Sequence, residues 1–322
     1  MSQQILTLLL GAEEPLDQPS PIRLRVVSRE SMRAGLSLVP PRERKPRYTA
    51  LALWHLLSLD APTVAALWTW FVARCCGVVL PWSAPAAMFL AVWMLYATDR
   101  LLDARPNAAS PELEERHRFH HHHKRAFLAG IVGASVLLAG LLPQIAPEAL
   151  RLYALLASLL FAYFFLIHIY PSNSASVDAH RLPKELAVGV FFPAAVFIPT
   201  VARAPGLRLM LAPAALLFAA VCTLNCLYLY AWEHPGSRAE AHWTTRFATQ
   251  HLPALSGITV MLCCGVFALE PRGVAMLTLA SGMSVVFLLL LHWQRERLSA
   301  IHLRAAADVA LLTPLLLVFL LR

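Results

Sequence analysis

Charged residues are scarce in this chain, and their scarcity excludes most soluble proteins. Only 14% of the 322 residues are Asp, Glu, Lys or Arg, whereas ordinary soluble domains carry about 25%. The hydrophobic share of 58% and the mean hydropathy of +0.59 also exclude an intrinsically disordered chain. We therefore expect an integral membrane protein.

Several motifs that would indicate other functions are also missing. The sequence has no phosphate-binding glycine loop, no Ser-His-Asp signature and no nucleic-acid motif, so no nucleic-acid partner is expected. The six cysteines lie in apolar stretches without disulfide or zinc spacing, and we interpret them as packing residues. No secretory signal peptide is expected, because the apolar run at residues 5–10 has no basic residue before it.

Long apolar stretches fill most of the chain. Residues 1–47 are polar, basic and rich in proline, and are interpreted as a cytosolic tail. Residues 48–322 are expected to form an all-α transmembrane domain, because a helix of about 20 apolar residues crosses a bilayer. Residues 48–59 are expected to lie along the interface or to extend the first span. The nine predicted spans are 61–81, 84–103, 126–143, 150–169, 185–202, 209–232, 252–269, 273–293 and 305–321.

The basic residues predict the orientation of these spans. The chain has a formal net charge of +8, and 21 of its 27 Lys and Arg residues fall on the side of the N-terminal tail. Because cytoplasmic loops carry an excess of Lys and Arg, we expect a cytosolic N-terminus and an external C-terminus in an inner or cytoplasmic membrane. The sequence leaves the oligomeric state open.

A pair of carboxylates ends the second predicted span. Asp99 and Asp103 are four residues apart and therefore project from one face of a helix. Their mutual repulsion favours a bound cation, and Mg²⁺ takes one or two carboxylates together with water and phosphate oxygens. The alternative is an interfacial charge cluster, in which Asp99, Arg100, Asp103 and Arg105 only terminate the span.

The same segment carries a resemblance to a known family. The string Tyr96-Ala-Thr-Asp-Arg-Leu-Leu-Asp103 resembles the first aspartate-rich motif of the UbiA family of membrane prenyltransferases, with Asp99, Arg100 and Asp103 at matching positions. Residues 170–171 and 183–186 resemble that family's connection between its fourth and fifth helices. Two departures stand out, since Leu95 and Tyr96 replace the first Asn-Asp pair and the second aspartate-rich motif is largely missing.

The resemblance implies a UbiA-like bundle that transfers a prenyl chain from an allylic diphosphate to a hydrophobic acceptor, with Mg²⁺ as cofactor. Asp99 and Asp103 would bind the metal, and Glu233 would replace the second motif. The implied diphosphate ligands are Arg100, Arg118, Lys124, Arg181 and Lys184. The implied prenyl-cavity aromatics, each of which could instead pack helices, are Tyr96, Phe164, Tyr228 and Trp232.

Two other functions stay open at this point. The degenerate second motif favours a non-catalytic isoprenoid-binding, lipid-binding or carrier protein on the same scaffold. Alternatively, His168 and His292 could ligate a haem from two helices. The run His120–His123 is either a patch for diphosphate or anionic lipid, or a solvated basic loop.

Overall fold

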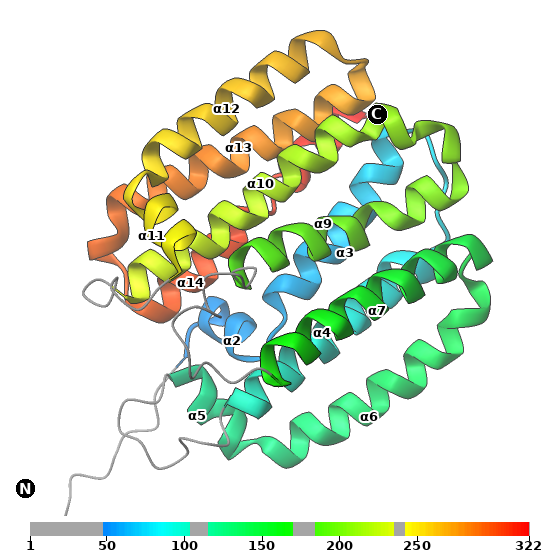
Figure 1. The fold of residues 1–322 in the computed structure, drawn as a ribbon. Coiled ribbons are helices and arrows are strands. Elements are labelled where there is room, and N and C mark those ends of the chain that lie inside the picture. The colour runs from blue at the N-terminus through cyan, green and yellow to red at the C-terminus, as the bar shows by residue number, and fades with distance from the viewer. Residues whose placement is uncertain (1–47, 104–114, 170–183, 235–241, 322) are drawn as a thin grey trace, which may run out of the picture. The chain divides into compact units, whose positions relative to one another are not determined.

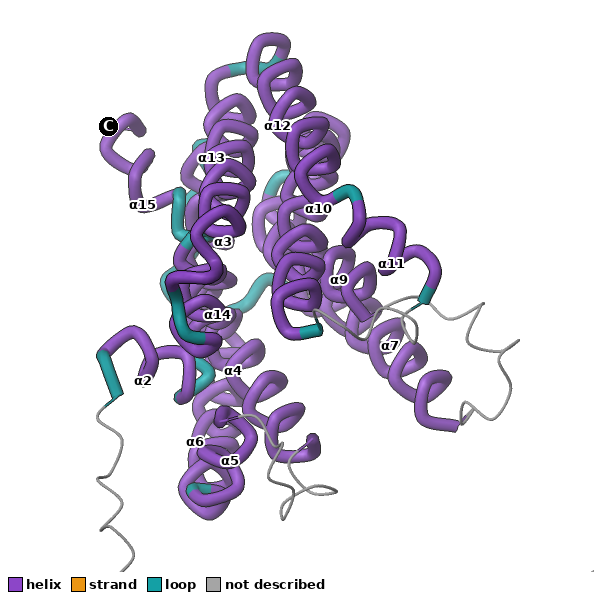
Figure 2. The backbone as a smooth tube through the Cα atoms, turned by 90° about the vertical axis from the view of Figure 1, so that its left-hand side faces the viewer, coloured by secondary structure: helices purple, strands orange, loops and turns teal. Residues whose placement is uncertain are grey.

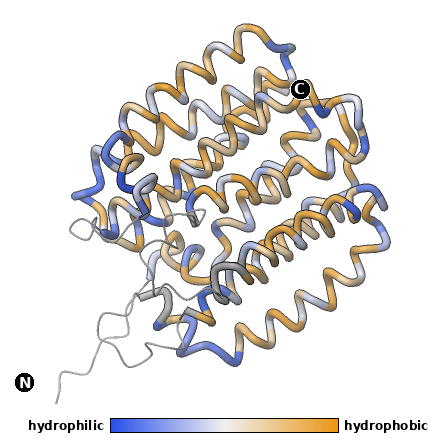
Figure 3. Tube along the Cα trace, in the orientation of Figure 1, coloured by the Kyte–Doolittle hydropathy of each residue, from blue (hydrophilic) through white to orange (hydrophobic). Residues whose placement is uncertain are grey.

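The computed structural model describes residues 48–103, 115–169, 184–234 and 242–321. All of these belong to one of the chain's two units, Tyr48–Arg322. Every regular element in the described ranges is a helix, which confirms the all-α prediction for this part of the chain (Figure 1). The helices run lengthwise beside one another, apolar along their lengths and more hydrophilic near their ends (Figure 3).

The α-helices are α2 (Ala50–Leu56), α3 (Asp60–Cys75), α4 (Ser83–Asp103), α5 (Glu115–His122), α6 (Lys124–Leu141), α7 (Pro147–Ile169), α9 (Lys184–Arg203), α10 (Arg208–Glu233), α11 (Trp243–Gln250), α12 (Leu252–Leu269), α13 (Arg272–Gln294), α14 (Ala300–Val309) and α15 (Pro314–Leu317). Short 3₁₀ segments are η2 (Leu142–Gln144), η3 (Pro205–Leu207), η5 (Arg295–Arg297) and η6 (Val318–Leu321).

Six helical segments in the described ranges are long and apolar enough to cross a membrane. The bent pair of α2 and α3 raises this number to seven if it forms one span. The predicted count of nine is not confirmed, because α4 and α7 form helices at two expected spans but are not among the six. The six segments are Lys124–Gln144, Glu185–Arg203, Pro205–Glu233, Leu252–Leu269, Arg272–Arg297 and Ala300–Leu320.

The core of the bundle lies where α3, α9, α10 and α13 meet. Trp68 and Phe71 of α3 are fully buried, and the Trp68 ring stacks on Phe218 of α10 with ring centroids 3.9 Å apart. Such aromatic pairs add to the gain from burying apolar area. α9 continues as a helix through Pro193 and Pro199, so neither proline interrupts the fifth predicted span.

A sharp turn separates the first two helices. α2 and α3 are bent by 88° at a short break, so the segment before the first span is a separate helix rather than a straight extension. Ser58 in this break has φ of +58°, in the left-handed region that non-glycine residues rarely adopt. Such a conformation persists only where the surrounding structure fixes it, and the Ser58 side chain bonds to two other helices, as described below.

The last predicted span is also broken. α14 ends at Val309, and α15 starts at Pro314. Two buried hydrogen bonds hold this break against neighbouring helices: Trp68 Nε1 of α3 donates to the Leu311 carbonyl at 2.8 Å, and Thr313 Oγ1 donates to the Ala280 carbonyl of α13 at 2.9 Å. A non-helical segment at membrane depth is tolerated when protein groups bond its backbone in this way.

Two consecutive helices, α6 and α7, pack on different partners. α6 lies against α4, whereas α7 lies against α9. Figure 2 shows α6 and α7 diverging toward the lower end of the bundle. The space between these two helix pairs holds the cavity described below.

Candidate functional site

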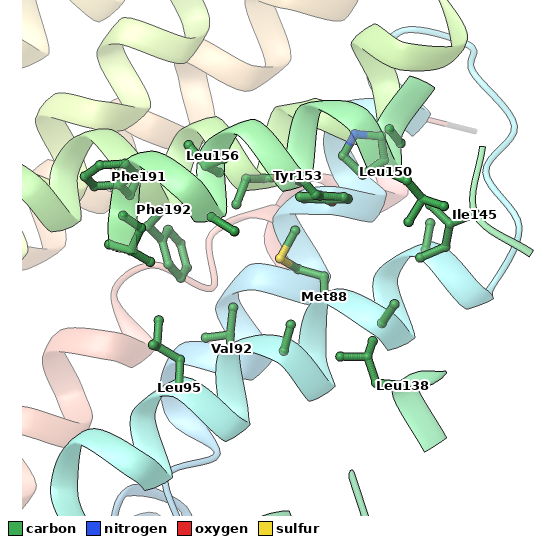
Figure 4. A pocket seen from close by; sticks show the side chains of 18 of the residues that line it. Met88, Val92, Leu95, Leu138, Ile145, Leu150, Tyr153, Leu156, Phe191 and Phe192 are labelled. Atoms are coloured by element: carbon green, nitrogen blue, oxygen red, sulfur yellow. Dashed lines mark hydrogen bonds between the residues drawn. The ribbon is translucent and has the colours of Figure 1, made fainter. Parts of the chain in front are cut away.

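A cavity of about 590 Å³ lies between α4 on one side and α7 and α9 on the other (Figure 4). Its volume falls within the range of roughly 300–1,000 Å³ that is typical of small-molecule sites. Met88, Val92 and Leu95 of α4 face side chains from the other helices across the space. The facing side chains include Leu150, Tyr153, Leu156, Phe191 and Phe192.

The cavity is long and apolar. Its lining residues on α4 run from Ala84 to Asp99, which corresponds to about 22 Å at a rise of 1.5 Å per residue. Arg203 lines the opposite end from Asp99, because its Nη1 donates to the Val79 carbonyl just before α4 begins. An extended hydrocarbon chain matches this shape, with one charged group available at each end.

Asp99 is the acidic residue that the structure places at the cavity. Its side chain is half-buried, and Tyr96 lines the same wall one helical turn earlier. The predicted partner Asp103 lies in the last turn of α4, but its side chain is outside the described part of the structure. Of the predicted metal ligands, Asp99 alone is therefore described at the cavity.

Arg100 belongs to a different environment from its neighbour Asp99. Adjacent helical residues point about 100° apart, and Arg100 turns into the packed side of α4, where it is 4% exposed. Its Nη1 donates to the His55 carbonyl at 2.6 Å and to Ser58 Oγ at 3.0 Å. Its Nη2 donates to Asp60 Oδ2 at 3.4 Å. The guanidinium thus fixes the turn between α2 and α3 and is not directed at a diphosphate in the cavity.

Glu233, the third predicted metal ligand, lies at the end of α10. It forms an ion pair with Arg304 of α14 and does not line the cavity. The described residues therefore do not bring Asp99 and Glu233 together at the cavity. The arrangement of three carboxylates expected from sequence is therefore not assembled among these residues. A single carboxylate is the smallest number of protein ligands with which Mg²⁺ is usually bound.

Two predicted cavity aromatics instead pack among α10, α12 and α13. Tyr228 is fully buried, and its hydroxyl lies 2.7 Å from Ser256 Oγ. Trp232 Nε1 donates to His292 Nδ1 at 3.0 Å. Neither side chain lines the cavity. His292, one of the two proposed haem ligands, already accepts this bond, and the side chain of the other, His168, is outside the described part.

The remaining predicted residues are spread over other elements. Arg118 on α5 and Lys124 on α6 are exposed, and neither lines the cavity. Lys184 begins α9 and Phe164 lies in α7, but their side chains are outside the described part. Arg181 falls in a segment that is not described.

The histidine run does not behave as one unit. His120 is fully buried, and its Nε2 lies 3.0 Å from Ser58 Oγ. Its ring also stacks on Phe127 with centroids 4.0 Å apart. His121, His122 and His123 are exposed. Three of these histidines are thus exposed, as expected for a solvated segment, although His121 and His122 lie on helix α5 rather than in a loop. The expectation is wrong for His120, because α5 turns that residue against the α2–α3 turn.

A second group of polar residues was not predicted as a site. His55 Nδ1 lies 2.5 Å from Asp60 Oδ2, and the amide of Asn225 donates to Asp308 Oδ1 at 3.3 Å. His55, Asp60 and Asp308 each offer one atom that could ligate a metal ion, and these three atoms lie within 4.8 Å of one another. Asp60 and Asp308 could have been suspected from sequence, because an acidic residue beside or within an apolar span is rare and is often functional.

Searches with the whole sequence and structure identify no relative. No protein-family model, no curated protein and no solved structure matches the chain. The site must therefore be interpreted from its own geometry.

Proposed function

We propose that this protein binds a long apolar chain, of isoprenoid or related lipid type, within a membrane. The cavity between α4, α7 and α9 carries this proposal: it is about 590 Å³ in volume and lined almost wholly by apolar side chains. The candidate membrane spans support a bilayer as the source of the ligand. The distribution of basic residues along the sequence supports an orientation with Asp99 near the cytosolic face.

The chemistry of the cavity determines the ligand class. Each CH₂ group moved from water into such a site contributes about 0.8 kcal/mol, so a chain filling the length between Asp99 and Arg203 gains its affinity mainly from apolar contact. Tyr153 uses its hydroxyl to donate to the Ala195 carbonyl and presents its ring to the cavity. The wall therefore offers few polar groups to a ligand except near Asp99 and Arg203.

Filling the cavity tests this proposal directly. Ala157 of α7 lines the cavity and is exposed, so Ala157→Trp places an indole in the space where the chain would lie. Ala154 lies one turn earlier on α7, is also exposed and does not line the cavity, so Ala154→Trp is the matched control. We expect Ala157→Trp to weaken binding of a photoreactive farnesol analogue at least tenfold and Ala154→Trp to leave it unchanged. Equal binding by both variants would refute the proposal.

Prenyl transfer is the second candidate function, favoured by the position of Asp99 at one end of the cavity. An allylic diphosphate whose chain occupies the cavity would place its head group near Asp99, where a carboxylate-bound Mg²⁺ would neutralise the departing diphosphate. The resemblance of residues 96–103 to the first UbiA motif supports the same substrate class.

Release of pyrophosphate distinguishes the two candidates. For a transferase we expect Mg²⁺-dependent release from at least one prenyl diphosphate in the presence of a hydrophobic acceptor. We also expect Asp99→Asn combined with Asp103→Asn to abolish both release and diphosphate binding. Binding of the farnesol analogue without any release supports a carrier or binding protein, whereas unchanged diphosphate binding in the double variant excludes the metal-dependent site.

A further inference from the structure

Five polar side chains from five helices meet away from the cavity. This polar cluster consists of His55 of α2, Asp60 of α3, Arg100 of α4, Asn225 of α10 and Asp308 of α14. Four of the five are at most 7% exposed, and Asp308 is partly buried. None of them lines the lipid cavity. The cluster is therefore a separate feature, and its interpretation does not depend on the proposed function.

The charges of the polar cluster do not balance. Asp60 and Asp308 carry one negative charge each when ionised, and Arg100 supplies one positive charge through its contact with Asp60 at 3.4 Å. With His55 neutral, one negative charge remains uncompensated, and a proton taken up by His55 or by one of the carboxyl groups brings the cluster to zero charge. An unpaired charge in such surroundings is costly, and buried carboxyl groups usually take up a proton or a cation instead.

The contacts between the two carboxyl groups favour a proton. A carboxylate oxygen of Asp60 and one of Asp308 lie within 4.8 Å of each other, and two ionised carboxylates at this distance in a buried site repel each other. A proton shared between the two carboxyl groups removes this repulsion. Aspartic proteases show the same behaviour, since their two close carboxylates share one proton.

A divalent metal ion fits the polar cluster less well. Two ligands of a tetrahedral zinc ion, each about 2.1 Å from the metal, lie roughly 3.4 Å apart. His55 Nδ1 and Asp60 Oδ2 are only 2.5 Å apart, which is a hydrogen-bond distance. A divalent ion would also change the net charge from −1 to +1, whereas one proton brings it to zero.

The hydrogen bonds of Asn225 independently indicate a proton-binding site. Its amide nitrogen donates to Asp308 Oδ1, but its carbonyl oxygen is buried and has no hydrogen-bond partner among the described residues. A rotated amide would accept a hydrogen bond from protonated Asp308, since an Asn side chain offers a donor at one end and an acceptor at the other. Asn225 can therefore bond to either protonation state of Asp308.

We propose that the polar cluster is an intramembrane proton-binding site, in which Asp60 and Asp308 share one proton. Other ionisable groups that interact with these two carboxyls are the Tyr96 hydroxyl of α4 and the Cys222 thiol of α10, and Cys226 lies near both of these groups. His120 of α5 is connected through Ser58. Release of the proton would leave two carboxylates in contact and would weaken the attachment of α14, directly before its break at residues 310–313.

The pH dependence of unfolding tests this site. The folded protein would hold a proton that an unfolded aspartate releases above about pH 4. Above about pH 6.5, where the histidine of the unfolded chain is also neutral, the unfolded state binds fewer protons. Stability therefore falls as pH rises in this range, with a tenfold change in the unfolding constant per pH unit for one proton. Asp308→Asn carries a neutral isostere, and we expect it to remove this tenfold slope. Glu296→Gln, which changes an exposed carboxylate, is the control and should keep the slope.

Infrared spectroscopy of the purified wild-type protein provides a second readout that does not require a stable variant. We expect the C=O stretch of a protonated carboxylic acid at neutral pH, and its loss in Asp308→Asn. Absence of that band in the wild type overturns the proposal, as does a pH slope that Asp308→Asn leaves unchanged. Stoichiometric metal in the wild-type protein that disappears in Asp308→Asn would also overturn it, in favour of a metal site.

Discussion

Replacing Arg100 with methionine distinguishes a structural role for this residue from a diphosphate-binding role. Methionine keeps an unbranched apolar stem but removes the guanidinium and its three contacts, to the His55 carbonyl, Ser58 Oγ and Asp60 Oδ2. All three acceptors lie in or beside the turn between α2 and α3. The substitution therefore removes the positive charge beside the Asp60 carboxylate and one hydrogen-bond donor from each of the three acceptors.

The expected loss of stability on Arg100→Met follows from the burial of the Arg100–Asp60 ion pair. Arg100 and Asp60 are 4% and 1% exposed, and removing one member of a buried ion pair costs about 3–5 kcal/mol. We expect a loss of this size in the free energy of unfolding. Adding Asp60→Asn to Arg100→Met should recover part of it, because no uncompensated carboxylate is then left behind.

Reversible unfolding in detergent, followed by far-ultraviolet circular dichroism, measures this loss. Arg125→Leu is the control, because Arg125 is exposed on α6 and its loss should change stability by no more than about 0.5 kcal/mol. The reasoning is refuted if Arg100→Met unfolds within about 1 kcal/mol of the wild type while losing affinity for diphosphate. That result would support the role in diphosphate binding that the resemblance implied for Arg100.

Two further substitutions probe the packing of the bundle. Gly273→Ala should destabilise the protein by about 1–3 kcal/mol, because the added Cβ would collide with the Cys75 carbonyl oxygen where α13 begins beside the end of α3; unchanged thermal unfolding would contradict that close approach. His120→Ala should cost about 1–3 kcal/mol by removing the partner of Ser58, whereas the exposed His122→Ala should cost less than about 0.5 kcal/mol. Equal unfolding temperatures of these two variants would contradict the burial of His120.

The helices could be predicted from sequence because apolar length is a local property. The span expected at 185–202 is α9, Lys184–Arg203, and the span expected at 126–143 overlaps α6, Lys124–Leu141. The breaks could not be predicted in the same way. The positive φ of Ser58 has no local signal and depends on bonds to distant helices. Pro314 marks the interruption after Val309 locally, but the bond from Trp68 that supports the break comes from a distant helix.

The candidate site was predicted only in part, for a related reason. Asp99 and Tyr96 line the cavity, and their roles as metal ligand and prenyl contact stay predictions. Arg100 and Glu233 do not line the cavity, because each pairs with a residue that lies far away in sequence, Asp60 and Arg304 respectively. Such pairings depend on which helices pack together, and the spacing of charges along one helix cannot reveal them.

Mapping the contacts of a bound chain tests the central claim most directly. The purified protein in lipid nanodiscs would be irradiated with an isoprenoid alcohol that carries a diazirine at its apolar end, and labelled peptides would be identified by mass spectrometry. The account predicts labels on cavity residues such as Met88, Tyr153 and Phe192. Labels confined to exposed residues outside the cavity, such as Val132 and Leu159, would contradict it.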